Sequence, residues 1–141
     1  MVDYLNNTGK IPAKIVLKPT LKSSDGVKEF MVEASANPNV IGVITWCHTF
    51  SPAKMWIRGL EVLTKPLLQL ATQHHKEIPW ETIDMDFMNL NQAAHGDREF
   101  GYIVSRLGIK RKVVVGHYTD PEVAEKLGTW ARACAGWDAS N

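Results

Sequence analysis

The sequence has little that would indicate a secreted, membrane-bound or nucleic-acid-binding protein. Only two of its 141 residues are cysteines, and they lack both CxxC spacing and the density of a disulfide-rich scaffold. The longest apolar runs, such as 40–44, are far too short to span a bilayer, and nothing at the amino terminus resembles a signal peptide. Lys plus Arg (16) and Asp plus Glu (15) leave a formal net charge of +1. We therefore expect a cytoplasmic protein with reduced thiols and with neither a membrane nor a nucleic-acid partner.

Signatures of phosphate and metal binding are also missing. Neither GxGxxG nor the Walker-type GxxxxGK[ST] occurs, which argues against dinucleotide and nucleoside triphosphate binding. His74 and His75 are adjacent in sequence, so their side chains diverge and are poorly placed to chelate one ion. No HxxxH or paired-carboxylate spacing supports a metal site elsewhere. We expect no metal ligands and no cofactor in this chain.

What is present is an alternation of short apolar runs with longer amphipathic segments. Strands are predicted over 13–18, 40–45, 66–70 and 112–115, and helices over about 24–36, 51–63, 90–107 and 120–135. Such alternation predicts a parallel sheet with helices on both faces. The fold class is α/β: a three-layer α-β-α arrangement, flavodoxin-like or Rossmann-like, with about four strands in a single domain over 1–141.

The first residues do not fit the start of such a fold. Residues 1–7 read as the last turns of a helix, which would normally follow a strand, and no strand precedes it. The first strand of the layout is therefore expected to be missing. Runs 13–18 and 40–45 must then pair directly or leave open edges, and an open apolar edge favours pairing with another chain. This predicts self-association.

Function in a doubly wound sheet gathers beyond the carboxyl ends of the strands. The loops at 46–50, 71–80 and 116–119 are polar and aromatic, which suits a small polar ligand. Gln92 and His95 are three residues apart, so a helix would place them on one face, which Glu99 and Tyr102 continue. These side chains can donate to and accept from a polyhydroxylated ligand. The alternative is a solvated helix face with Asn89 and Asn91 as turn formers, and spacing alone favours it.

Two long segments indicate a family. HTFSPAKMW (48–56) and IDMDFMNLNQAAHG (83–96) closely resemble L-arabinose isomerase, and 65–68 and 113–117 match in the same order. The resemblance extends from Met1 to about Gly136. The chain is similar to the amino-terminal domain of that family, truncated at both ends, without its first strand.

The resemblance implies an aldose–ketose isomerase that converts L-arabinose to L-ribulose, or D-galactose to D-tagatose, with bound Mn²⁺. The metal-binding residues of the family belong to later domains, so this chain is expected to be inactive alone. Family members assemble as trimers or hexamers in which the first domain reaches into a neighbour's active site. By this resemblance Phe50, Gln92 and His95 would contact the sugar, with His48 a weaker candidate on the same rim. Partners would be the sugar and other isomerase subunits.

Two further hypotheses remain open. The chain could be a stand-alone sugar-binding or assembly domain without catalysis. It could also be a minimal isomerase that recruits metal through His48, His95 and acidic residues of a neighbouring chain.

Overall fold

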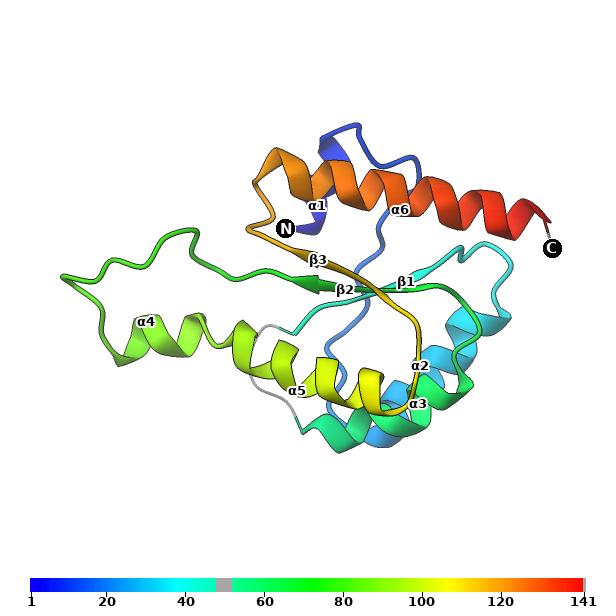
Figure 1. Ribbon diagram of the computed structural model, residues 1–141, viewed down its shortest axis with the longest axis horizontal. Helices are drawn as coiled ribbons and strands as arrows, with labels where there is room; N and C mark the ends of the chain where they lie inside the picture. Colours follow the sequence, from blue (N-terminus) through cyan, green and yellow to red (C-terminus); the bar gives the residue numbers. More distant parts are fainter. Residues whose placement is uncertain (48–51, 141) are drawn as a thin grey trace.

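The computed structural model describes residues 1–47 and 52–140, with only the backbone described for 88–90. Its elements, in chain order, are α1 (Val2–Asn7), α2 (Ser24–Ala36), β1 (Val43–Thr45), the 3₁₀ helix η1 (Ala53–Trp56), α3 (Ile57–Val62), β2 (Leu67–Ala71), α4 (Met85–Leu90), α5 (Ala93–Arg106), β3 (Lys112–Val115) and α6 (Pro121–Ser140). The strands form a parallel sheet in the order β1-β2-β3. Helices α1 and α6 cover one face, and α2, α3 and α5 the other (Figure 1). The predicted three-layer α/β fold is confirmed.

The core divides into two clusters, one on each side of the central strand β2. Leu67 belongs to the cluster that also contains Phe100 and Val104 of α5. Leu68 and Leu70 belong to the cluster that contains Leu127 of α6. Because successive side chains of a strand point to opposite faces, β2 supplies side chains to both clusters. Its apolar sequence is therefore that of a strand buried on both sides.

Helix ends follow the expected capping chemistry with one exception. Ser23 accepts a hydrogen bond from the Gly26 amide (3.1 Å) and caps α2, which begins at Ser24 as predicted. Gly108, in the left-handed region (φ +69°), follows α5, as glycine commonly does after a helix. The predicted end of the last helix near Gly136 is wrong, because α6 continues to Ser140. Even so, no helix within the described ranges is long and apolar enough to cross a membrane.

The predicted strand at 13–18 is not formed, so the described residues contain three strands rather than four. The side-chain amide of Asn6 takes the place of a strand neighbour. Its Oδ1 accepts from the Ile15 amide (2.8 Å), and its Nδ2 donates to the Ile15 carbonyl (2.9 Å). One backbone position of the run is thus satisfied without a sheet partner.

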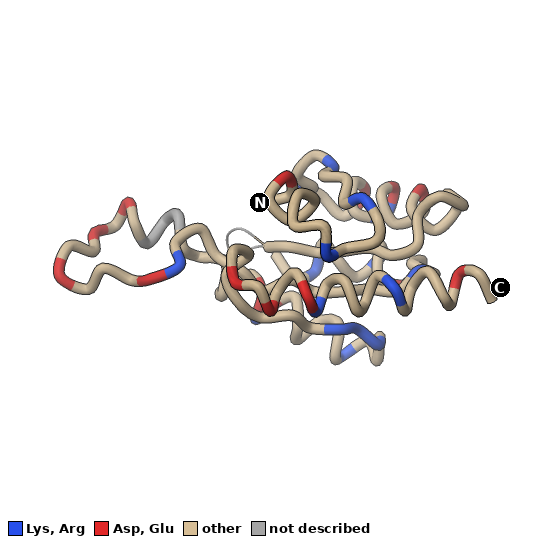
Figure 2. Tube along the Cα trace, turned by 90° about the horizontal axis from the view of Figure 1, so that it is seen from above, with Lys and Arg blue, Asp and Glu red and all other residues tan. Residues whose placement is uncertain are grey.

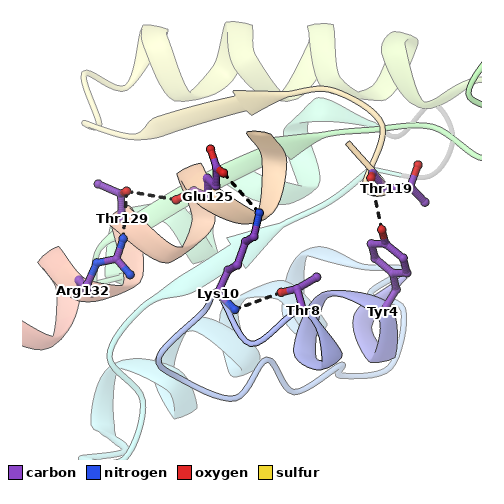
Figure 3. Close-up of polar contacts among 7 residues, drawn as sticks. All are labelled: Tyr4, Thr8, Lys10, Thr119, Glu125, Thr129 and Arg132. Atoms are coloured by element: carbon purple, nitrogen blue, oxygen red, sulfur yellow. Dashed lines mark hydrogen bonds and ion pairs between the residues drawn. The ribbon is translucent and has the colours of Figure 1, made fainter. Parts of the chain in front are cut away.

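The amino-terminal segment instead contacts α6 and the turn before it. Lys10 forms an ion pair with Glu125 (3.3 Å), and Tyr4 donates to the Thr119 carbonyl (Figure 3). A Cβ on Gly128 would lie 2.2 Å from the Lys10 carbonyl oxygen, so only glycine permits this approach. The amino-terminal segment therefore packs on the outer helix layer rather than in the sheet.

One edge of the sheet is consequently left open. Within the described part of the chain, β1 pairs with β2 only. Val16 and Leu17, which were predicted to lie in the neighbouring strand, are about two-thirds exposed (66% and 67%). Of the two outcomes predicted for the runs 13–18 and 40–45, the described residues show the open edge and not direct pairing.

We expect Asn6→Ala to lower the free energy of unfolding by about 2 kcal/mol, because both Ile15 backbone groups lose their part-buried partner. Urea denaturation of the 141-residue chain measures the change. Asn7→Ala, at an exposed position of the same helix, is the matched control and should change stability by less than about 0.5 kcal/mol. Equal effects of the two substitutions would contradict the role given to Asn6.

Candidate functional site

The candidate site lies at the carboxyl edge of the sheet, where β2 and β3 end and α5 begins. Between β2 and α5 the chain leaves the body as a projecting arm that carries α4 (Figures 1 and 2). Every residue from 76 to 86 on this arm is exposed. The edge that a doubly wound sheet commonly uses for ligands is therefore continuous with the most extended part of the molecule.

Gln92 and His95 lie at the root of this arm. The predicted helix over 90–107 is interrupted, since α4 ends at Leu90 and α5 begins at Ala93 with Gln92 as its N-cap residue. Asn91 lies in the turn, as expected for a turn former, and its Oδ1 accepts from the His75 amide (3.1 Å). The His95 amide donates to the Gln92 carbonyl (3.1 Å). The two predicted contact residues are thus close together, although Gln92 precedes the helix.

The predicted polar row continues along α5. His95 Nε2 lies 3.6 Å from Glu99 Oε1, and the hydroxyl of Tyr102 accepts from Arg106 (2.9 Å). An open hollow of about 490 Å³ adjoins this row between η1 and α5; it is lined by Pro52, Ala53, Lys54, Arg98, Glu99 and Tyr102. The carboxylate of Glu99 and the phenol of Tyr102, which line this hollow, can form hydrogen bonds to hydroxyl groups of a ligand. Phe50 and His48, the other predicted contact residues, lie outside the described residues.

Of the remaining histidines, His117 joins the arm to the body and His75 packs within the arm. His117 Nδ1 lies 2.7 Å from Thr119 Oγ1, and its Nε2 lies 3.3 Å from the His74 carbonyl oxygen. The His75 ring stacks on Phe87 with ring centroids 4.5 Å apart. Each ring therefore has a structural contact. Among the described residues, no three His, Cys, Asp or Glu side chains are grouped so that they could hold a metal ion.

An ion pair adds to this attachment. Lys76 Nζ lies 2.9 Å from Asp120 Oδ1, which joins the start of the arm to the turn before α6. The hydrogen bond from Lys76 lowers the pKa of the Asp120 carboxyl, and the same bond raises the pKa of Lys76. Both side chains are exposed to solvent, so the pair orients the arm more than it stabilises the fold.

The sequence did not reveal a series of hydrogen-bonded side chains that lies beneath α5. Gln69, on the otherwise apolar β2, is only 4% exposed. Its Nε2 donates to the Asp97 carbonyl (3.0 Å), and its Oε1 accepts from Arg111 Nε (2.9 Å). The detectable signal was a glutamine within the apolar run 67–71, because a buried amide requires hydrogen-bond partners.

Burial of Asp97 raises the pKa of its carboxyl to about 6 from 3.8, and the hydrogen bond from Gln69 opposes this shift. The folded state therefore holds this proton more tightly than the unfolded state. The stability that this proton contributes is fully present below pH 3.8 and is lost as the pH rises through about 6.

We expect Asp97→Asn to remove this loss, so that the variant gains stability relative to wild type between about pH 4 and pH 7. Urea denaturation at several pH values measures the difference. Asp86→Asn, an exposed carboxyl on α4, is the control and should keep the wild-type profile. Parallel profiles for wild type and Asp97→Asn would show that the environment of Asp97 does not perturb its protonation.

Comparison with known proteins identifies the family to which the chain belongs. Residues 1–141 match the family model described as the L-arabinose isomerase N-terminal domain. The L-arabinose isomerase of Bifidobacterium adolescentis is 95% identical over 140 residues, which are 99% of this chain and 28% of that protein. That of Bifidobacterium animalis subsp. lactis is 80% identical over 141 residues (100% and 28%), and that of Thermotoga neapolitana is 60% identical over 136 residues (96% and 27%). The chain spans little more than a quarter of these relatives, and it belongs to the family of L-arabinose isomerase amino-terminal domains.

Proposed function

We propose that this chain acts as the amino-terminal part of an L-arabinose isomerase, where it supplies sugar-contacting residues and subunit contacts. The observation that carries the proposal is the position of Gln92 and His95. They lie at the carboxyl edge of the sheet and at the root of an exposed arm, where they can reach a sugar held largely by another part of the enzyme. Both thiols are buried, in keeping with a cytoplasmic enzyme.

The reaction requires firm positioning of an open-chain sugar. Conversion of L-arabinose to L-ribulose moves one proton from C2 to C1 and another from the C2 hydroxyl to the carbonyl oxygen at C1. Hydrogen bonds from Gln92 and His95 would fix the hydroxyl groups while these transfers occur. D-Galactose has the same configuration at C2 to C4, so the same contacts would serve its conversion to D-tagatose. Phe50 and His48 are proposed to line the same rim.

No group of side chains among the described residues could hold a metal ion. We infer that Mn²⁺, and the carboxylates that move the protons, belong to other parts of the complete enzyme. The matched relatives are more than three times as long as this chain, so they have ample room for such residues.

The arm is proposed to make the subunit contact. Ile78, Trp80, Ile83 and Met85 on this arm are all exposed, Trp80 by 76%. Residues 76–86 contain one lysine and four acidic residues, a formal charge of −3; since the whole chain carries +1, the remainder carries +4. A second subunit thus offers a surface of opposite charge, and contact would bury the apolar side chains.

We expect Gln92→Ala and His95→Ala, introduced into a complete relative, each to lower kcat/KM for L-arabinose about tenfold or more, as for loss of one hydrogen bond to substrate. The melting temperature should change little, because His95 is largely exposed. Lys126→Ala, on exposed α6 surface across the sheet, is the control and should leave both quantities unchanged. A large loss of melting temperature with unchanged kcat/KM would falsify the proposed sugar contacts.

We expect the 141-residue chain to self-associate at micromolar concentration through its arm. Trp80→Ser combined with Met85→Ser should shift the molar mass measured by light scattering toward that of the monomer, because the contact loses its largest apolar side chains. High salt should act in the same direction. Val32→Ser, at an exposed apolar position of α2, is the matched control. A wild-type chain that stays monomeric throughout would exclude this contact.

A further inference from the structure

Gln69 is the one residue of β2 whose side chain is polar, and the strand directs it toward α5. It shares a face with Leu67, which packs in the cluster beneath that helix. The side chain is 4% exposed, so an unpaired amide here would cost far more than a single hydrogen bond returns. Its placement therefore requires partners on both sides of the amide.

The partners determine which way the amide points. Arg111 can only donate, and it donates from Nε to Gln69 Oε1 (2.9 Å). The Asp97 carbonyl can only accept, and it accepts from Gln69 Nε2 (3.0 Å), with Asp97 Oδ1 a longer second acceptor (3.4 Å). A flipped amide would face a donor with a donor and an acceptor with an acceptor. A cationic donor at one end also polarises the amide and strengthens the bond at the other.

A glycine in α5 leaves space for the hydrogen-bonded side chains of Gln69 and Arg111. A Cβ on Gly101 would lie 3.2 Å from a terminal nitrogen of Arg111 and 3.8 Å from Gln69 Oε1. Arg111 also donates to Ser105 Oγ (3.4 Å) one turn further along. Arg111 thus crosses α5 at Gly101, whereas Gln69 bonds Asp97, one turn earlier in the same helix. The two side chains fix α5 along its axis at successive turns.

We propose that Gln69 is a positioning residue, which holds the first turns of α5 against the sheet and thereby sets where His95 stands at the carboxyl edge. His95 is two residues before Asp97 on the same helix, so displacement of the Asp97 carbonyl displaces the His95 backbone with it. The consequence for sugar binding rests on the proposed function. The proposal that Gln69 holds α5 against the sheet is independent of the proposed function.

The first experiment measures amide hydrogen exchange across α5 in the 141-residue chain. Gln69→Leu removes both bonds of the amide. Gln69→Glu keeps an acceptor for Arg111 but loses the donor to Asp97. This variant therefore tests the Asp97 hydrogen bond separately from the Arg111 hydrogen bond. Both variants should increase exchange at residues 97–101 about tenfold, the factor for loss of one hydrogen bond.

The control is Leu127→Ala, a truncation of a fully buried side chain on α6 that packs on the opposite face of the sheet. It lowers global stability and should raise exchange throughout the core without selecting α5. Selective exchange at 97–101 in both Gln69 variants is the expected result. Exchange that rises uniformly, as in Leu127→Ala, would overturn the proposal and leave Gln69 a core residue only.

The second experiment introduces the same three substitutions into a complete relative and measures KM and kcat for L-arabinose. Gln69→Leu and Gln69→Glu should each have a KM at least three times that of Leu127→Ala, when each variant is measured at the same temperature interval below its own melting temperature. Selective opening of α5 with unchanged KM would retain the hold on the helix but refute the sugar contact of His95. Unchanged exchange with a raised KM would refute the positioning role itself.

Discussion

The burial of β2 on both faces is the constraint on which the rest of the structure depends. A three-stranded sheet is too small to shield its own middle, so Leu67 and Leu68, on opposite faces, each need a helical layer. α5 and α6 supply those layers. Gln69 then lies where an apolar side chain would be expected, and it is tolerated because α5 offers a backbone carbonyl and Arg111 a donor. The helix that covers β2 is therefore also bonded to it.

Most of this architecture could be predicted from local patterns. The apolar runs at 40–45, 66–70 and 112–115 all contain strands, and the amphipathic segment at 24–36 is a helix. The run at 13–18 has the same character but no neighbouring strand. Composition indicates that a segment is suited to a sheet, whereas a strand exists only if another strand is present to pair with it. The Asn6 side-chain amide bonds one backbone position of that run, and such a side-chain contact is not encoded in the hydrophobic periodicity.

The arrangement of the candidate residues was predictable only in part. Spacing correctly put Gln92 and His95 near each other. It wrongly extended one helix across both, because the chain turns at Asn91, whose side chain accepts a hydrogen bond from His75, sixteen residues earlier. The Gln69–Asp97 contact likewise joins residues 28 positions apart. Where a site is built from tertiary hydrogen bonds, the sequence shows the polar residues but not the pairings.

The way the arm is attached bears on how such a domain would engage a partner. An exposed segment of this length would lose much conformational freedom on docking if it were tethered only by its two ends. Here the root is tied by the Lys76–Asp120 ion pair, by His117 against the His74 carbonyl and by the Asn91 contact to His75. Each contact is modest alone, yet together they restrict the directions in which Trp80 and its apolar neighbours can extend. These contacts restrict the arm before any partner binds, so less conformational entropy would be lost on association. This favours a defined contact over nonspecific adhesion. The same root holds Gln92 and His95, so a partner that docks on the arm would meet these side chains in a fixed place.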